Sequence, residues 1–198
     1  MSRVIAGVFI GGRGSRMGGA VKGLLAAPGG EVTLVERWRR MLAALGVEVV
    51  LAGQHVAYAS LGLEMIADEP PGIGPLGGLV GLLRRAGTAR ALAFACDMPF
   101  VSARLVGRLI AAPPAAVIAP RRGDHWEPLC ARYDAPRVLP HALRRVAAKE
   151  HRLQPLLDEV GAVALSPEPG DDRELHDWDA PGDVCLEERI AKTQRRKD

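Results

Sequence analysis

The sequence predicts a three-layer α/β fold, in which helices cover both faces of a mostly parallel sheet. Three observations favour it. Short apolar segments alternate with longer segments of helical periodicity, which is the pattern of parallel-sheet proteins. The composition, 48% hydrophobic and 25% charged, is typical of a globular protein, and the length of 198 residues suits one domain. We therefore expect a single domain over residues 1–198, with a disordered basic tail at about 192–198.

The first half of the chain contains three expected strands and two expected helices. Thr33 begins the first helix, because Glu36 three residues later completes a capping box, and Gly46 ends it. A loop rich in proline and glycine leads into the second helix. The strands are expected over 4–10, 47–51 and 63–67, and the second helix over 76–85.

The second half continues the alternation. An apolar strand over 90–95 ends at Cys96-Asp97-Met98-Pro99, and Ser102 caps the helix that follows. Turn residues at 167–172 mark a polar end to the chain. The remaining elements are a strand over 115–119, a candidate antiparallel strand over 127–133, and helices over 137–148 and 153–160.

The composition also excludes several classes of protein. The net charge is only +3, the basic residues are scattered and aromatic residues make up 4%, so we expect no nucleic-acid partner. No apolar run approaches the length of a membrane span, so we expect no membrane partner. Cys96, Cys130 and Cys185 are too widely spaced for a zinc site or a disulfide framework, which favours a reducing, cytoplasmic location.

A glycine-rich segment after the first strand is the first candidate for a binding site. Residues 11–19 include five glycines and two arginines, and Lys22 follows. Backbone without side chains can approach phosphates closely, while its N–H groups and the nearby cations bind the negative charge. The segment matches neither a Walker A loop nor a dinucleotide fingerprint. A nucleotide site is the leading hypothesis, and a flexible turn with surface arginines is the alternative.

Carboxylates supply the second signal. Asp97 follows a buried strand, at the edge of the sheet where open α/β folds bind ligands, and a carboxylate there can hold Mg²⁺. An Asp that caps a turn or helix is the alternative, although Ser102 is better placed as the cap. Asp177 and Asp179 share one side of an extended segment and could complete a metal site, or could belong to a solvated turn. Asp68, after the third strand, is ambiguous by itself.

Three sequence blocks carry a resemblance to a known family. They resemble the MobA-like nucleotidyltransferases, which modify molybdenum cofactor, and most of all the guanylyl-transferring branch. The likeness runs through nearly the whole chain and implies a Rossmann-like nucleotidyltransferase fold. The blocks are Gly11-Gly12-Arg13-x-x-Arg16-Met17-Gly18-Gly19 with Lys22-Gly23-Leu24, Gly74-Pro75-Leu76-x-Gly78, and Cys96-Asp97-Met98-Pro99.

The resemblance implies a role for each matching position. The catalytic residues would be Arg16 and Lys22, which neutralise the triphosphate, and Asp97, which binds both GTP and Mg²⁺. Asp179 would be the second metal ligand. The segment 124–129 looks like the part of these enzymes that faces the pterin. The nucleotide-binding residues would be Phe9, Ile10, Gly11, Gly12, Lys22, Ala52, Asp68 and Asp97.

The implied reaction is transfer of GMP from GTP to the terminal phosphate of molybdenum-bound molybdopterin, with transient contacts to proteins of molybdoenzyme maturation. The chain departs from the family pattern at Val21, where an aspartate is usual, and at Asp177 and Asp179, where asparagines are usual. Three alternatives stay open. They are a cytidylyltransferase acting on the same cofactor, a sugar-phosphate nucleotidyltransferase, and a non-catalytic protein that binds nucleotide or cofactor.

Overall fold

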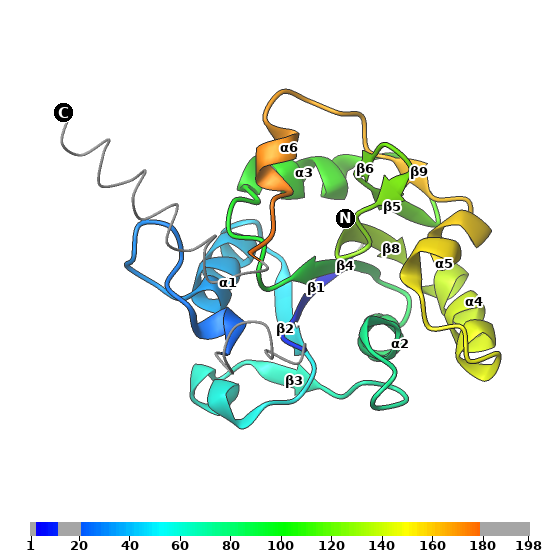
Figure 1. The fold of residues 1–198 in the computed structure, drawn as a ribbon, viewed down its shortest axis with the longest axis horizontal. Coiled ribbons are helices and arrows are strands. Elements are labelled where there is room, and N and C mark those ends of the chain that lie inside the picture. Colours follow the sequence, from blue (N-terminus) through cyan, green and yellow to red (C-terminus); the bar gives the residue numbers. More distant parts are fainter. Residues whose placement is uncertain (1–2, 12–20, 179–198) are drawn as a thin grey trace.

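A seven-stranded sheet forms the centre of the protein, in a computed structural model that describes residues 3–11 and 21–178 (Figure 1). The strand order is β3-β2-β1-β4-β8-β5-β9, and β8 alone among these strands runs against its neighbours. The predicted mostly parallel sheet is therefore confirmed. The strands are β1 (Val4–Phe9), β2 (Glu48–Ala52), β3 (Glu64–Ile66), β4 (Arg90–Ala95), β5 (Val117–Ala119), β8 (Cys130–Asp134) and β9 (Val163–Ala164).

Helices cover both faces of this sheet, as predicted (Figure 1). One face packs against α1 (Leu34–Ala44) and α3 (Ala103–Ala111). The other packs against α2 (Pro75–Ala86), α4 (Ala135–Ala147) and α5 (Leu153–Glu159). The sheet is thus the middle of three layers.

The central strand β1 shows why the sequence forms this architecture. Ile5 and Phe9 belong to the core on the α2 side, whereas Ala6 and Val8 belong to the core on the α1 side. A strand buried on both faces has a continuous apolar sequence instead of an alternating one. Gly7 lets α2 approach closely, since a Cβ there would lie 2.8 Å from the Leu82 side chain.

The helix caps follow the sequence signals. The Thr33 side chain accepts a hydrogen bond from the Glu36 amide at 3.3 Å, and Ser102 accepts one from the Leu105 amide at 3.3 Å.

The candidate strand over 127–133 is antiparallel, as expected, but begins only at Cys130. The reason is a turn before the strand, in which the Cys130 amide donates to the Glu127 carbonyl at 3.0 Å, and Pro128 within it has no N–H to pair with a neighbouring strand.

Several short elements have no counterpart in the sequence prediction. They are too short to show a periodic pattern, and long-range contacts hold them. The predicted tail over 192–198 lies outside the described residues. None of the helices in the described ranges is long and apolar enough to cross a bilayer. The short elements are η2 (Lys22–Leu24), η3 (Val56–Leu61), the hairpin of β6 (Arg121–Arg122) and β7 (His125–Trp126), β9, and α6 (Asp171–Glu174).

Candidate active site

The carboxyl ends of the parallel strands bring several predicted site residues to one edge of the sheet. Phe9 pairs with Ala52 of β2 and with Ala95 of β4. The pairing continues past the strand ends, because the Ile10 amide donates to the Ala52 carbonyl at 3.1 Å and the Cys96 amide donates to the Phe9 carbonyl at 3.1 Å. The backbone around Gly11, Ala52 and Asp97 therefore meets at the place where open α/β folds bind ligands.

Lys22 and Asp97 form an ion pair at this edge. The Lys22 Nζ atom lies 2.7 Å from Asp97 Oδ2, although the two residues are 75 positions apart in the sequence. Both side chains are largely but not fully buried, with 24% and 19% of their surfaces exposed. A partly desolvated pair is screened by water less than a surface pair, so its charges act strongly on a nearby ligand.

A short helical turn, η2, positions Lys22. The amide of the next residue, Gly23, donates to the Tyr58 hydroxyl at 3.2 Å. A Cβ on Gly23 would lie 2.6 Å from that hydroxyl and 2.6 Å from the Val35 side chain, so only glycine allows this approach. The contact fixes η2 against η3 and α1, and burial raises the pKa of Tyr58.

Trp178 joins the pair from the far end of the described chain, a contact that was not predicted from the sequence. Its amide donates to the Asp97 carbonyl at 2.9 Å, and its carbonyl accepts from Lys22 Nζ at 3.0 Å. Asp177 is exposed. The only sequence signal near this contact was the acidic pair on either side of Trp178.

Asp68 lies on the β3 side of the same edge. Burial raises the pKa of its carboxyl above the usual value. The residue approaches α2 closely, because a Cβ on Gly78 would lie 2.9 Å from the Phe9 ring and 3.2 Å from Asp68 Oδ1. The glycines of α2 therefore have a physical reason: they let the helix lie against the segment that carries Asp68.

The segment 124–129, which resembles a pterin-facing segment, borders a cavity of about 690 Å³. The β6–β7 hairpin forms one wall and α5 with the loop before it forms the other. The Trp126 amide donates to Gln154 Oε1 at 2.9 Å, the Trp126 carbonyl accepts from Gln154 Nε2 at 2.7 Å, and the indole donates to Asp158 Oδ1 at 2.7 Å. The polar side chains that line the cavity are Asp124, His125, His151, Arg152, Gln154 and Asp158.

Glu127 follows β7 directly in the chain, and only 18% of its side chain is exposed. Its carboxylate accepts a hydrogen bond from Arg122 Nε at 2.7 Å. Burial nevertheless raises the pKa of Glu127, and the negative charge of Asp177 adds to that effect.

The donors at the carboxyl edge fit a hard divalent cation only with help from a ligand. Within residues 3–11 and 21–178, no cluster of three or more histidines, cysteines or carboxylates could hold a metal by itself. Asp97 already attracts one cation, the Lys22 ammonium. A single carboxylate together with phosphate oxygens and water is a common donor set for Mg²⁺.

The structure thus brings together six of the predicted site residues, with Asp68 on the β3 side of the same edge. Gly12, Arg16 and Asp179 lie outside the described residues. The six that meet are Phe9, Ile10, Gly11, Lys22, Ala52 and Asp97.

Known proteins are similar to this chain in sequence and in fold. A family model described as the MobA-like NTP transferase domain matches residues 6–163. A relative from Xanthomonas euvesicatoria pv. vesicatoria, named molybdenum cofactor guanylyltransferase, is 38% identical over 130 residues, which are 65% of this chain and 64% of the relative. The match therefore spans slightly less than two thirds of that relative's length. A relative of the same name from Pseudomonas putida is 32% identical over 181 residues, covering 88% of this chain and 92% of its own.

A solved structure extends the likeness to three dimensions. The crystal structure of molybdopterin-guanine dinucleotide biosynthesis protein A from Archaeoglobus fulgidus superposes with a TM-score of 0.73, over 95% of this chain and 98% of its own. The two sequences are 23% identical, so this comparison shows the fold.

Proposed function

The chain belongs to the MobA-like NTP transferase family. On that premise we propose that it transfers GMP from GTP to the terminal phosphate of molybdenum-bound molybdopterin and releases pyrophosphate. Relatives named molybdenum cofactor guanylyltransferase support this substrate pair. The structural observation that carries the proposal is the Lys22–Asp97 ion pair at the carboxyl edge of the sheet, beside the backbone of residues 9–11.

The reaction needs positioning and charge neutralisation more than it needs a nucleophilic side chain. An oxygen of the acceptor phosphate, already ionised at neutral pH, attacks the α-phosphorus of GTP. A new P–O bond forms as the bond from the α-phosphorus to the β-phosphate oxygen breaks, and the departing pyrophosphate takes the electron pair. Such transfers are catalysed mainly by alignment and by stabilisation of the spreading negative charge.

In this proposal each residue at the carboxyl edge of the sheet contacts a particular part of the nucleotide. The amides near Ile10, Gly11 and Gly12 bind phosphate oxygens, and the ammonium of Lys22 and the guanidinium of Arg16 neutralise the triphosphate. The backbone at Ala52 and the Asp68 carboxyl contact the nucleoside. The carboxyl ends of β2, β1 and β4 are thus assigned to the nucleotide.

A divalent metal, which we propose to be Mg²⁺, would be held by Asp97 and Asp179 together with phosphate oxygens. When bound, it would neutralise charge on the α-phosphate and the leaving pyrophosphate. Asp97 would then hold the metal in addition to its ion pair with Lys22.

We assign the acceptor to the cavity between the β6–β7 hairpin and α5. Its volume of about 690 Å³ is in the range of small-molecule sites. Pro75, the first residue of α2, lines the cavity, and α2 begins at the carboxyl edge of the sheet. His125, His151 and Arg152 offer donors for an anionic acceptor.

We further propose that the protein works in the cytoplasm as a single domain over residues 1–198 and that it passes its product on through transient contacts with maturation proteins. The free thiols of Cys96 and Cys130 agree with a reducing compartment.

Pyrophosphate release from a nucleotide panel tests the proposal. Purified protein is incubated with Mg²⁺, molybdenum-bound molybdopterin and each of GTP, CTP, ATP and UTP. We expect release with GTP that depends on the acceptor. Release with CTP instead would indicate the cytidylyl alternative, and release with a sugar phosphate in place of the pterin would indicate a sugar-phosphate nucleotidyltransferase. A folded protein that releases no pyrophosphate with any combination of nucleotide and acceptor would indicate a non-catalytic binding protein.

A further inference from the structure

The side chain of Trp178 lies between the two loops that carry the charged residues of the edge. Only 2% of the residue is exposed. Its ring packs with Ala27 and Leu34, which follow Lys22 in the chain, and meets the Phe100 ring edge-on at 6.3 Å, three residues after Asp97. One side chain therefore contacts both the segment after Lys22 and the segment after Asp97.

The main chain of Trp178 binds the same two residues directly. Its N–H donates to the Asp97 carbonyl at 2.9 Å, and its C=O accepts from Lys22 Nζ at 3.0 Å. Each of the three residues Lys22, Asp97 and Trp178 is thus bonded to the other two. Lys22 and Trp178 are 156 positions apart in the sequence, so tertiary contacts, and not the local chain, keep them together.

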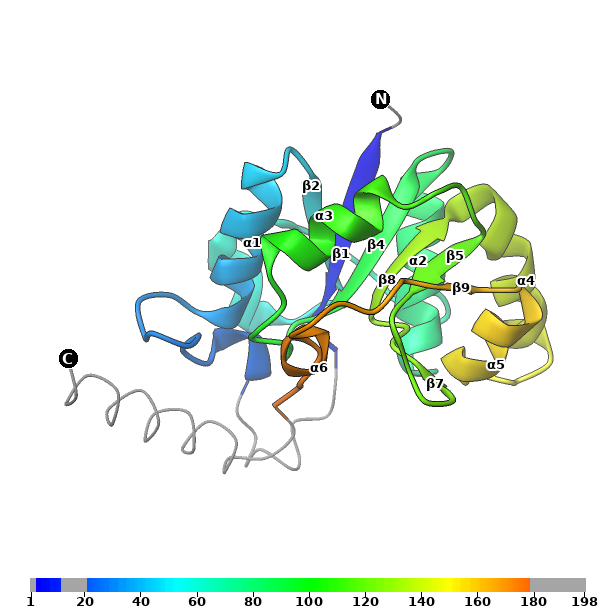
Figure 2. The ribbon, with the colours of Figure 1, turned by 90° about the horizontal axis from the view of Figure 1, so that it is seen from above.

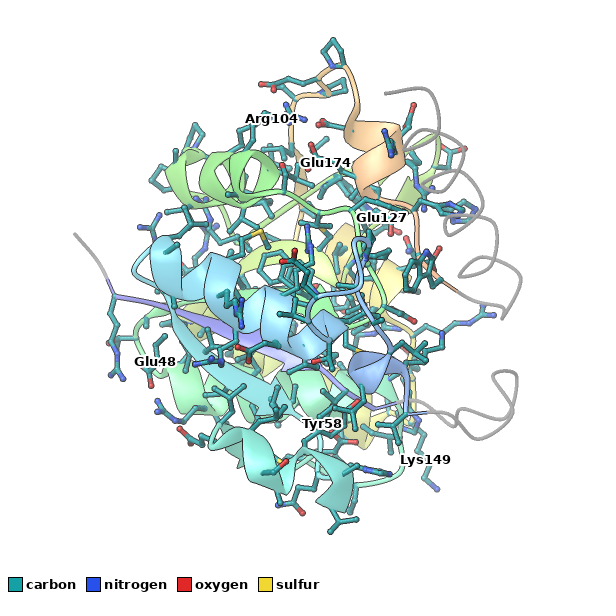
Figure 3. All side chains as sticks on the ribbon, turned by 90° about the vertical axis from the view of Figure 1, so that its left-hand side faces the viewer. Glu48, Tyr58, Arg104, Glu127, Lys149 and Glu174 are labelled. Atoms are coloured by element: carbon teal, nitrogen blue, oxygen red, sulfur yellow. The ribbon has the colours of Figure 1, made fainter. Side chains whose placement is uncertain are left out.

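The approach of the chain to Trp178 is anchored to α3. The Glu174 carboxylate accepts hydrogen bonds from the Ser102 amide at 2.9 Å and the Ser102 hydroxyl at 2.7 Å, and pairs with Arg104 at 2.7 Å (Figure 3). Asp171 pairs with Arg104 at 2.9 Å and with Arg108 at 2.8 Å. Figure 2 shows α6 at the same end of the molecule as the carboxyl ends of β1 and β4.

We infer that Trp178 is a positioning residue, which sets the separation and direction of the Lys22 ammonium and the Asp97 carboxylate toward the nucleotide. The inference rests on the proposed function. A buried ring that served stability alone would not need its own N–H and C=O to engage the two charged residues of the site. If the ring is lost, both loops lose the surface between them, and the ion pair is free to take up other geometries.

Three variants test the inference, namely Trp178→Ala, Trp178→Phe and, as a control, Leu83→Ala. Leu83 is fully buried near the carboxyl end of α2, at the opposite edge of the sheet, and its loss destabilises the fold to an extent comparable with the loss of a tryptophan ring. All are assayed for GTP-dependent transfer at a temperature where circular dichroism shows each to be folded. Hydrogen exchange is measured in parallel over residues 21–25 and 96–100.

We expect Trp178→Ala to lower kcat about 10- to 100-fold, as misplaced catalytic groups do, with a smaller change in the KM for GTP. Trp178→Phe, which keeps an aromatic ring between the loops, should recover most of kcat, and Leu83→Ala should stay close to the wild-type value. Exchange over 21–25 and 96–100 should accelerate in Trp178→Ala and not in Leu83→Ala.

Two outcomes would overturn the inference. One is wild-type exchange over both segments in folded Trp178→Ala. The other, in a case where the wild type is active, is a Trp178→Ala enzyme that keeps the wild-type kcat, or a kcat that falls as much in Leu83→Ala as in Trp178→Ala. If the wild-type protein transfers no guanylyl group, the proposed function fails, and the exchange comparison still decides whether Trp178 positions the two loops.

Discussion

Among the described residues, the Asp97 carboxylate and the Trp178 carbonyl both bind Lys22, and they come from distant parts of the chain. Such a cation is preorganised: its position is set before the ligand arrives, so it needs little rearrangement as charge develops on the phosphates. This makes Lys22 a transition-state group in the proposed reaction, and not only a contributor to GTP affinity.

Lys22→Ala should therefore lower kcat about 100- to 1,000-fold, the effect of losing one preorganised electrostatic donor. Lys149→Ala is the control, because Lys149 is exposed after α4 and should leave kcat unchanged (Figure 3). Steady-state kinetics of pyrophosphate release give both values. A Lys22→Ala enzyme with a raised KM and an intact kcat would make the lysine a ground-state binder.

Asp68 gives a prediction about pH. Burial raises the pKa of its carboxyl in the folded protein above the unfolded value of about 4. Ionisation of Asp68 therefore lowers the free energy of unfolding of the protein. This loss is complete when the pH is above the pKa in the folded protein, and it is absent when the pH is below the pKa in the unfolded chain. Asp68→Asn should raise the melting temperature at neutral pH, and the gain should shrink toward zero near pH 3.

The exposed Asp172 is the matched control, since Asp172→Asn should show no such pH-dependent gain. The same Asp68→Asn variant should bind GTP more weakly if the carboxyl contacts the nucleoside. A gain in melting temperature that stayed constant from pH 7 to pH 3 would show that the stabilisation does not come from the buried charge.

At the scale of elements, α2 depends on glycine where it passes the end of β3. A Cβ on Gly81 would lie 2.4 Å from the Ala67 carbonyl oxygen, a backbone atom that cannot move aside easily. For Gly107 in α3, no atom of the described residues, apart from the backbone of the helix itself, would lie within 4 Å of such a Cβ. The two helical glycines therefore respond in opposite directions to the same substitution.

Gly81→Ala should lower the free energy of unfolding by about 1–3 kcal/mol, the usual range for overpacking. Gly107→Ala should raise it by about 0.5–1 kcal/mol, since alanine is the better helix former. Urea denaturation of the two variants measures both. Equal stabilisation by the two would mean that α2 can shift away from β3 without loss.

At the scale of the whole molecule, the sequence predicts those strands and helices whose position is determined by a local sequence pattern. The continuous apolar runs of β1 and β4 reveal strands buried on both faces, and Thr33 and Ser102 mark the starts of α1 and α3. The β6–β7 hairpin left no such signal, because its strands have two residues each and the Gln154 side chain holds it from α5.

The residues of the site also fall into those that could be predicted from the sequence and those that could not. The residues after β1 and β4 were predictable, because parallel strands deliver their carboxyl ends to one edge. The contacts of Trp178 with Lys22 and Asp97 were not, since they join segments far apart in sequence and use mainly backbone atoms. The roles of Gly12, Arg16 and Asp179 stay predictions from the resemblance.

Transfer of a labelled guanylyl group tests the central claim most directly. Protein is incubated with GTP labelled on the α-phosphate, Mg²⁺ and molybdenum-bound molybdopterin, and the label in the pterin product is measured for the wild type and for Asp97→Asn. The account predicts label in the product with the wild type and loss of nearly all of it with a folded Asp97→Asn. Wild-type labelling by Asp97→Asn, or no labelling by the wild type, would contradict the account.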